Sequence, residues 1–145
     1  MGIVVSEKDE ALLRLLGTHA RLSTAELGRR LGISRTTVQS RLERLERSGI
    51  IEGYTVRLSD AYHKGRVRAS VLMVIAPRAL ISLIPVIKKL PSVDRIQSVS
   101  GPYDLVVDVN AADMQQLDTT IDALGEMEGV EKTISLIVLS TRFER

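Results

Sequence analysis

Hydrogen-bonding side chains gather between Ser34 and Arg47, and their types suit contacts with nucleic acid. At 100° per residue, Val38, Leu42 and Leu45 fall on one narrow face of a helix, and the polar side chains point the opposite way. Arginine, threonine, serine and glutamine supply the donors and acceptors that base edges and backbone phosphates require. The predicted DNA-binding residues are Ser34, Arg35, Thr36, Thr37, Gln39, Ser40, Arg44 and Arg47.

This polar face has simpler interpretations as well. It fits the solvated side of an ordinary core helix, since runs of charge commonly face water. Glu43 could accept a hydrogen bond from cytosine, but we expect it to pair with Arg47. Arg41 lies at the edge of the buried face, where a structural ion pair and a DNA contact fit the sequence equally well.

Three predicted helices would position these side chains. The first begins at an N-cap, Ser6, and ends at Gly17. The second begins at Ser23 with a capping box, in which Ser23 and Glu26 satisfy each other's backbone amides. The segment 32–34, Gly-Ile-Ser, then forms a tight turn, and the third helix extends to about residue 48. This order is a helix-turn-helix.

A short hairpin is predicted directly after these helices. Residues 50–58 are rich in β-branched side chains around a central glycine. Tyr54 and Arg57 on this hairpin could contact the DNA backbone as a wing, or could simply pack against the helices. Residues 59–66 are polar and contain glycine, which is typical of a linker.

The second half of the chain predicts the order βαββαβ, the ferredoxin-like plan. The expected strands are 67–76, 93–100, 103–110 and 130–141, and the expected helices are 78–90 and a helix that follows the cap Asp113. Gln116 stands at the reciprocal capping position, and the buried stripe is Met114, Leu117, Ile121 and Leu124. The predicted fold class is α+β, with a DNA-binding domain (1–58), a linker (59–66) and a ferredoxin-like domain (67–145).

Composition excludes several kinds of site. The chain has 145 residues, 44% of them hydrophobic and 26% charged, a balance typical of a folded globular protein. It contains no cysteine, which excludes disulfides and cysteine-based zinc sites, and its two histidines are too far apart for a helical zinc motif. Its four aromatic residues are too few to stack single-stranded bases. We expect no metal and no cofactor.

Charge divides the chain into unlike parts. Residues 21–57 carry eight arginines and four glutamates, and residues 61–93 carry six basic residues and no acidic one. Residues 94–131 carry nine acidic residues and one arginine. Such a division suggests two domains with separate tasks.

One apolar stretch, from Ser70 to Ile87, could be mistaken for a membrane span. Arg78 would lie near its middle, where a charge is costly, and two prolines interrupt it. We interpret the stretch as a buried strand followed by a core helix. The chain also begins without the basic region of an export signal, so the expected location is the cytoplasm.

Two motifs resemble the Lrp/AsnC, or leucine-responsive, family of transcription regulators. The first runs from Arg21 through Gly32-Ile33-Ser34-Arg35 to Tyr54; the second is Gly101-Pro102-Tyr103-Asp104, followed by Gly129-Val130 before the last strand. The resemblance covers nearly the whole chain. It implies a winged helix-turn-helix in front of a domain for amino-acid sensing and assembly. The implied function is sequence-specific transcription regulation, not enzyme catalysis.

The resemblance also implies where an amino-acid effector would bind. Asp104 can pair with an α-ammonium group, and Ser100 and the loop amides can hold an α-carboxylate. The same loop also fits a tight turn in which Tyr103 packs and Asp104 caps, and Pro102 removes one amide that relatives usually have. The effector-binding residues that the resemblance implies are Val99, Ser100, Gly101, Tyr103, Asp104, Thr133 and Ser135.

The resemblance further implies a homodimer, with dimers associating into a higher oligomer such as an octamer. The strand 67–76 is compatible with this because it is too apolar to leave one side in water. A two-fold dimer would present paired helices to a palindromic operator in double-stranded DNA. No membrane partner is expected.

Two alternatives remain open from the sequence. Siroheme decarboxylases resemble the same family, but a tetrapyrrole site would need convergent histidines, and His19 and His63 are predicted in different segments. A metabolite-binding protein without DNA recognition is the other alternative, and the polar face of the third helix argues against it.

Overall fold

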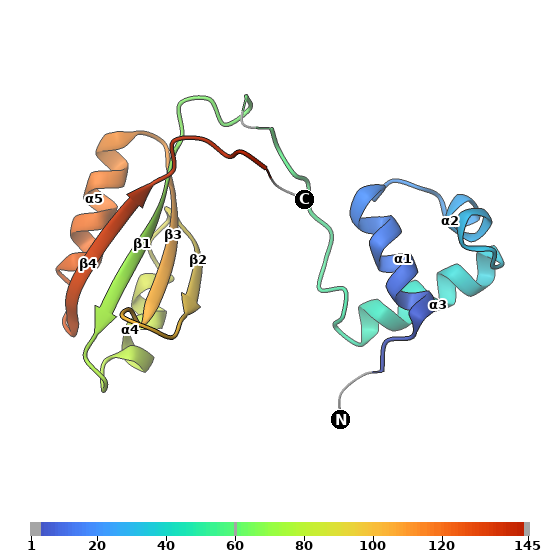
Figure 1. Ribbon diagram of the computed structural model, residues 1–145, viewed down its shortest axis with the longest axis horizontal. Coiled ribbons are helices and arrows are strands. Elements are labelled where there is room, and N and C mark those ends of the chain that lie inside the picture. The colour runs from blue at the N-terminus through green and yellow to red at the C-terminus, as the bar shows by residue number, and fades with distance from the viewer. Residues whose placement is uncertain (1–3, 60, 144–145) are drawn as a thin grey trace. The chain divides into compact units, whose positions relative to one another are not determined.

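The computed structural model describes residues 4–59 and 61–143, which belong to two compact units, Met1–Arg57 and Leu58–Arg145 (Figure 1). The first unit contains α1 (Glu7–Thr18), α2 (Thr24–Leu31) and α3 (Arg35–Arg47). The second contains β1 (Val67–Ile75), α4 (Leu80–Ile87), β2 (Val93–Ser98), β3 (Leu105–Ala111), α5 (Met114–Gly125) and β4 (Val130–Ile137). The ends of the predicted domains, 1–3 and 144–145, and linker residue 60 lie outside the described residues.

Serine caps begin all three helices of the first unit, as the sequence predicts. The predicted reciprocal box at Ser23 is only half formed. The Ser23 hydroxyl accepts from the Glu26 amide at 3.1 Å, but the Glu26 carboxylate contacts Arg29 at 3.0 Å instead of returning to the cap. The complete box forms at Ser6, where Asp9 is the reciprocal residue.

The predicted end of the first helix at Gly17 is wrong by one residue. α1 continues through Gly17 to Thr18, and His19 is its C-cap. The Thr18 hydroxyl donates to the Leu15 carbonyl at 3.1 Å, which satisfies one of the acceptors exposed in the last turn.

A tight turn joins α2 to α3 and confirms the predicted helix-turn-helix. Gly32 has φ of 68°, the left-handed conformation that glycine adopts without strain. Gly28 on α2 lies so close to the turn that a Cβ there would be 2.6 Å from the Ile33 carbonyl oxygen. Beneath the turn the three helices share a core of Leu12, Leu27, Val38 and Leu45.

The predicted hairpin at 50–58 is not formed, since these residues contain no strand. Ile50 and Ile51 pack against the helical core instead, and the Ile51 amide donates to the Leu45 carbonyl at 3.0 Å. The β-branched side chains therefore serve packing and not strand pairing, and an isolated two-stranded hairpin has little stability of its own. Residues 52–58 continue as exposed chain.

The second unit confirms the predicted ferredoxin-like plan. Its four strands form one antiparallel sheet in the order β2-β3-β1-β4, and α4 and α5 cover a single face (Figure 1). Buried and half-buried residues alternate along β1 and β3, so every second side chain enters the core under the helices. Val71, Met73, Leu105 and Val107 form the centre of this core.

The opposite face of the sheet carries no helix. Strand register places Leu72 beside Val106 on one neighbouring strand and beside Ile134 on the other, all on this face. Leu136 lies next along β4 and is half exposed. The residues Leu72, Val106, Ile134 and Leu136 are called the open sheet face below.

Several predicted boundaries need correction. The helix expected at 78–90 is only Leu80–Ile87, because residues 77–79 and 88–89 form turns. Met114 is 55% exposed at the first position of α5, whereas Thr120 is buried and its hydroxyl donates to the Gln116 carbonyl. The Gln116 side chain accepts from the Ala112 amide, one residue before the predicted partner. The strands expected at 93–100, 103–110 and 130–141 are Val93–Ser98, Leu105–Ala111 and Val130–Ile137.

No helix within 4–59 or 61–143 is long and apolar enough to cross a membrane. The stretch 70–87 contains most of β1 and all of α4, which agrees with its interpretation as a strand and a core helix.

Candidate functional sites

The outward face of α3 carries the predicted DNA-binding residues. Val38 and Leu45 anchor the helix in the core, and this leaves Arg35, Thr36, Gln39, Ser40, Arg44 and Arg47 exposed. Thr37 is half-buried. The Ser34 hydroxyl accepts from the Thr37 amide at 3.1 Å and shares a hydrogen bond with the Thr37 hydroxyl at 2.7 Å. The Ser34 hydroxyl therefore caps the helix, and the Thr37 hydroxyl is hydrogen-bonded to this cap.

The expected Glu43–Arg47 pair is not formed. Glu43 accepts instead from the Gln39 side-chain amide at 3.2 Å. Within the described residues, Arg35 and Arg47 make no ion pair, and both side chains face solvent. Two cations are thus available at opposite ends of the exposed face.

A buried carboxylate on α1 holds the other two arginines of this helix. Asp9 has no exposed surface; its Oδ1 accepts from Arg41 Nη1 at 2.8 Å and its Oδ2 accepts from Arg44 Nη2 at 2.6 Å. The amide and hydroxyl of Ser6 also donate to Oδ2, at 3.0 and 2.7 Å. The alternative of a structural ion pair at Arg41 is the one formed, and Arg44, predicted only as a DNA contact, shares it.

The electrostatics of this cluster favour the ionised carboxylate. Burial opposes the charged form of Asp9, but the hydrogen bonds from Arg44 and Ser6 outweigh it and hold the pKa of this carboxyl well below its usual range. The sequence does not single out Asp9, because its two arginine partners lie more than thirty residues away and no local pattern joins them.

A shallow hollow of about 490 Å³ lies on the same face of α3. Its lining is made of hydroxyls and guanidinium groups only: Thr36, Thr37, Ser40, Arg41 and Arg44. Such a lining offers several hydrogen-bond donors and two positive charges to a ligand.

A side chain of the exposed segment 52–58 bonds back to α3. Tyr54 Oη donates to the Glu46 carboxylate at 2.6 Å, and this hydrogen bond, together with burial, raises the pKa of Tyr54 to about 12. Tyr54 thus contacts α3 through its hydroxyl, while its side chain stays 61% exposed. Arg57 is exposed.

The predicted effector loop, 99–104, connects β2 to β3. Val99, Ser100 and Gly101 are exposed, Tyr103 and Asp104 are half-buried, and Gly101 has φ of 123°. The Asp104 amide donates to the Met73 carbonyl at 2.9 Å, and the Asp104 Oδ2 accepts from the Ile75 amide at 2.8 Å. Asp104 therefore fastens the loop to the end of β1, and one of its two oxygens is already engaged.

The other two predicted effector residues lie elsewhere on the sheet. Thr133 and Ser135 are opposite Met73 and Val71, on the face that the helices cover. The strand β1 separates them from β3 and its loop. One chain therefore does not gather the seven predicted residues around a common hollow.

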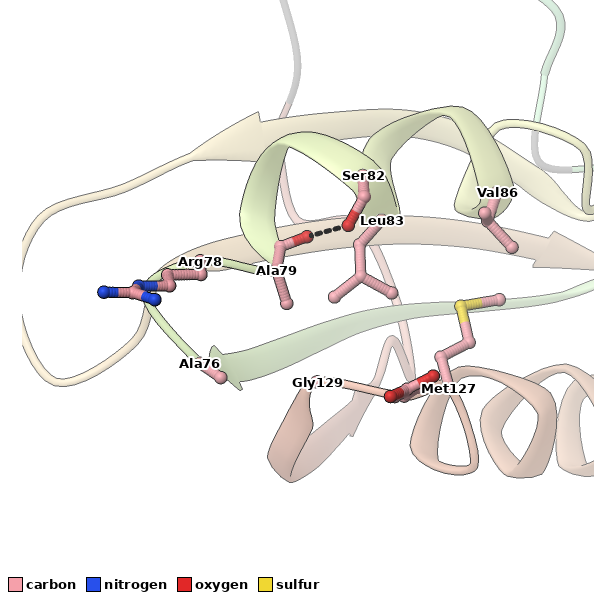
Figure 2. Close-up of a pocket in the computed structure, with 9 residues that line it drawn as sticks. Ala76, Arg78, Ala79, Ser82, Leu83, Val86, Met127 and Gly129 are labelled. Atoms are coloured by element: carbon pink, nitrogen blue, oxygen red, sulfur yellow. Dashed lines mark hydrogen bonds between the residues drawn. The ribbon is translucent and has the colours of Figure 1, made fainter.

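A larger hollow of about 700 Å³ opens between α4 and the connection from α5 to β4 (Figure 2). Leu83 and Val86 of α4 face Met127 across it, and Arg78 lies at one end with its guanidinium directed outward. None of the predicted effector residues lines it. Gly129 is necessary at its floor, because a Cβ there would be 2.3 Å from the Ala79 Cβ.

A polar network occupies one end of the uncovered sheet face. Asp108 on β3 accepts from the Ser70 hydroxyl at 2.8 Å and from Arg95 Nη2 at 2.7 Å. Arg66 donates to the side chain of Asn110 on the same strand at 2.8 Å. The residues from 4 to 59 and from 61 to 143 include no cluster of three or more histidine, aspartate or glutamate side chains able to hold a metal ion.

Comparison with known proteins matches both units. The family model described as winged helix-turn-helix DNA-binding matches residues 5–52, and the Lrp/AsnC ligand binding domain matches residues 71–145. An HTH-type transcriptional regulator of Pyrococcus furiosus, itself uncharacterised, is 32% identical, with 97% of each chain covered. The HTH-type transcriptional regulator LysM of Saccharolobus solfataricus is 29% identical, with 96% of each covered.

Solved structures agree over nearly the whole chain. The Neisseria meningitidis transcriptional regulator NMB0573, solved as an L-Met complex, has a TM-score of 0.86 at 25% identity and covers 97% of this chain and 94% of its own. The AsnC structure from E. coli has a TM-score of 0.87 at 23% identity, with 99% of this chain and 97% of its own covered, and shows the shared fold.

The Asp9 cluster predicts a specific dependence of stability on pH. Because the folded-state pKa of Asp9 is depressed, its contribution is fully present above the unfolded-state pKa of about 4 and is lost as pH falls below that. We expect Asp9→Asn to lower the free energy of unfolding by about 2 kcal/mol near neutral pH. The difference from the wild type should shrink below about pH 4. Urea unfolding followed by circular dichroism measures it.

Glu10→Gln is the matched control, since it removes a neighbouring, exposed carboxylate from the same helical turn. A stability loss for Asp9→Asn that stays constant down to pH 2, or one equal to that of Glu10→Gln, would contradict the assigned role.

Proposed function

Because the chain belongs to the Lrp/AsnC family and is a transcriptional regulator with a DNA-binding helix-turn-helix and an Lrp/AsnC ligand-binding domain, we propose that it binds a palindromic operator as a homodimer and responds to an amino acid. The observation that carries the proposal is the exposed polar face of α3, held outward by Val38 and Leu45.

The proposed DNA contacts divide along α3. Ser34, Arg35, Thr36 and Thr37 lie at the positive N-terminal end, where helix amides favour phosphate. Gln39 lies farther along, where side chains of a recognition helix meet base edges in the major groove, whereas Ser40 and Arg47 suit the DNA backbone. Arg44 reaches the surface while bonded to Asp9, so it suits the backbone and not a base.

The open sheet face supports a homodimer. Leu72, Val106 and Ile134 are only half-buried in one chain, and Leu136 is 52% exposed. A second copy that covers this apolar face would remove it from water. Dimers could associate further, into an assembly such as an octamer, through apolar side chains of α4, where Ile81 is 85% exposed.

The proposed effector is a free amino acid, supported by the L-Met complex of the Neisseria regulator. We propose the loop 99–104 as its contact, with Asp104 facing the ammonium group, Ser100 and the amides facing the carboxylate, and Val99, Gly101 and Tyr103 beside them. Thr133 and Ser135 are separated from this loop by β1 in one chain. The site would therefore be completed by another subunit.

No observation favours the decarboxylase alternative. His19 caps α1 and bonds Thr18, His63 lies in the turn at 61–65, and neither lines either of the two hollows described above. We propose a regulator without catalytic activity that works in the cytoplasm, because the chromosome of the prokaryotic relatives lies there.

Arg47→Ala tests the DNA contact. We expect weaker binding of double-stranded DNA by about tenfold, and a slope of log affinity against log salt that is flatter by about 1, because one exposed cation is lost. Gel shifts with fragmented genomic DNA across a salt series measure both. Arg14→Ala on α1, also an exposed arginine, is the matched control. Equal affinity and slope in the Arg47 variant and the wild type would refute this contact.

Leu72→Glu tests the homodimer. A charge in the middle of the open sheet face should be tolerated in a monomer but not in a buried interface, so we expect a monomeric mass by light scattering. Ile81→Glu, which places the same charge on the exposed side of α4, should leave the dimer intact. A dimeric Leu72→Glu protein would show that the subunits meet elsewhere.

Asp104→Asn tests the effector site. Asparagine keeps an acceptor for the Ile75 amide and loses only the charge, so the loop should remain folded. We expect L-Met, or whichever of the twenty amino acids raises the wild-type melting temperature, to bind at least about tenfold more weakly in calorimetry. Asp94→Asn, an exposed carboxylate on β2, is the control. Wild-type affinity in the Asp104 variant would remove Asp104 from the site.

A further inference from the structure

The Asp9 cluster carries more positive charge than its own carboxylate neutralises. Asp9 bonds Arg41 and Arg44 together, so one unit of positive charge remains after pairing. All four donors that surround it, the two guanidinium groups and the amide and hydroxyl of Ser6, come from the start of α1 and the middle of α3.

The surplus charge faces the hollow on α3. Arg41 and Arg44 are three residues apart and lie on one side of the helix, where both line the hollow with three hydroxyl side chains. Arg44 is 47% exposed although its Nη2 bonds a carboxylate that has no exposed surface. Its Nε and Nη1 make no hydrogen bond with any residue in 4–59 or 61–143.

Hydroxyls and guanidinium donors around a positively charged hollow suit one tetrahedral oxyanion. A guanidinium N–H donates to a phosphate oxygen as a charge-assisted hydrogen bond, and hydroxyls complete the shell. Because an unrestrained arginine has many rotamers, its pairing with Asp9 places the Nε and Nη1 donors before the anion arrives. Asp9 also cancels one of the two charges, which limits attraction to phosphates in general.

We propose that the hollow lined by Thr36, Thr37, Ser40, Arg41 and Arg44 binds one backbone phosphate of the operator, and that Asp9 is the positioning residue for both arginines. This inference rests on the proposed DNA binding and adds to it a specific atom group on the DNA and a residue outside the recognition helix. It assigns the first turn of α1 a part in DNA recognition.

The test replaces single phosphates by uncharged methylphosphonates. The probe is a duplex of about 30 bp, long enough for two half-sites and selected by the wild-type protein from a random pool. Each phosphate is replaced in turn, and affinities are measured at one salt concentration for the wild type and Arg44→Lys. Lysine keeps the charge but loses the guanidinium donors, and the half-exposed position tolerates it.

We expect one position in each half-site where the replacement weakens wild-type binding by about tenfold, the scale of one charge-assisted hydrogen bond. At that position the replacement should weaken the binding of the Arg44→Lys variant much less than that of the wild type, because the variant has already lost the contact between Arg44 and this phosphate. Arg14→Lys should behave as the wild type does. Equal losses for the wild type and Arg44→Lys at every position would overturn the phosphate site.

Asp9→Asn tests the positioning role with a second readout. It adds one unit of net positive charge, so affinity for a scrambled duplex should stay equal or rise, while affinity for the selected duplex and its methylphosphonate dependence should fall. A purely structural role would lower both affinities together. Retention of both selected-duplex affinity and methylphosphonate dependence would overturn the role of Asp9.

If circular dichroism shows that Asp9→Asn is unfolded, Asp9→Glu replaces it, because glutamate displaces the carboxylate by one methylene. The expected losses for the selected duplex are the same. Affinity for the scrambled duplex should stay equal, since no charge is added. A wild-type protein that selects no duplex from the pool would refute the proposed function itself. If the wild type instead selects a duplex and the variants bind it as the wild type does, only the inference is refuted.

Discussion

The buried carboxylate of Asp9 is the constraint on which the DNA-binding unit depends. A charged group without exposed surface is stable only when donors satisfy it, and here they come from Ser6 in its own helical turn and from two arginines of α3. The apolar core holds the three helices together but is not directional. The ion pairs are directional, so they determine how the start of α1 and the middle of α3 face each other.

The ligand-binding unit shows the same division between non-directional packing and single directional contacts. Val71 and Met73 secure the centre of the sheet under the helices, whereas the amide and side chain of Asp104 tie the β2–β3 loop to the end of β1. A ligand that competes for Asp104 would therefore act on the end of β1 as well as on the loop. Because β1 is hydrogen-bonded to both β3 and β4, a change at its end reaches both of its neighbours.

Local signals were sufficient for most of the fold and for part of the sites. The caps at Ser6 and Ser23 and the tight turn at Gly32 are short-range patterns, and each was predicted. The hairpin prediction failed because the β-branched Ile50 and Ile51 satisfy burial equally well by packing on helices. Thr133 and Ser135 were carried over from the family, and only the register with β1 reveals that they face the helices. Asp9 was missed as a partner of Arg44 because long-range ion pairs leave no periodic trace.

The arginines of α3 are consequently of two kinds. Arg41 and Arg44 are held by Asp9, so they can recognise a ligand only in the geometry that α1 imposes. Arg35 and Arg47 have no ion-pair partner in the described part of the chain and can follow the backbone of any duplex. Attraction to DNA in general and placement on a particular site then depend on different side chains of one helix. A substitution at Asp9 would change placement on a particular site without removing the general attraction to DNA, although Asp9 itself is out of reach of DNA.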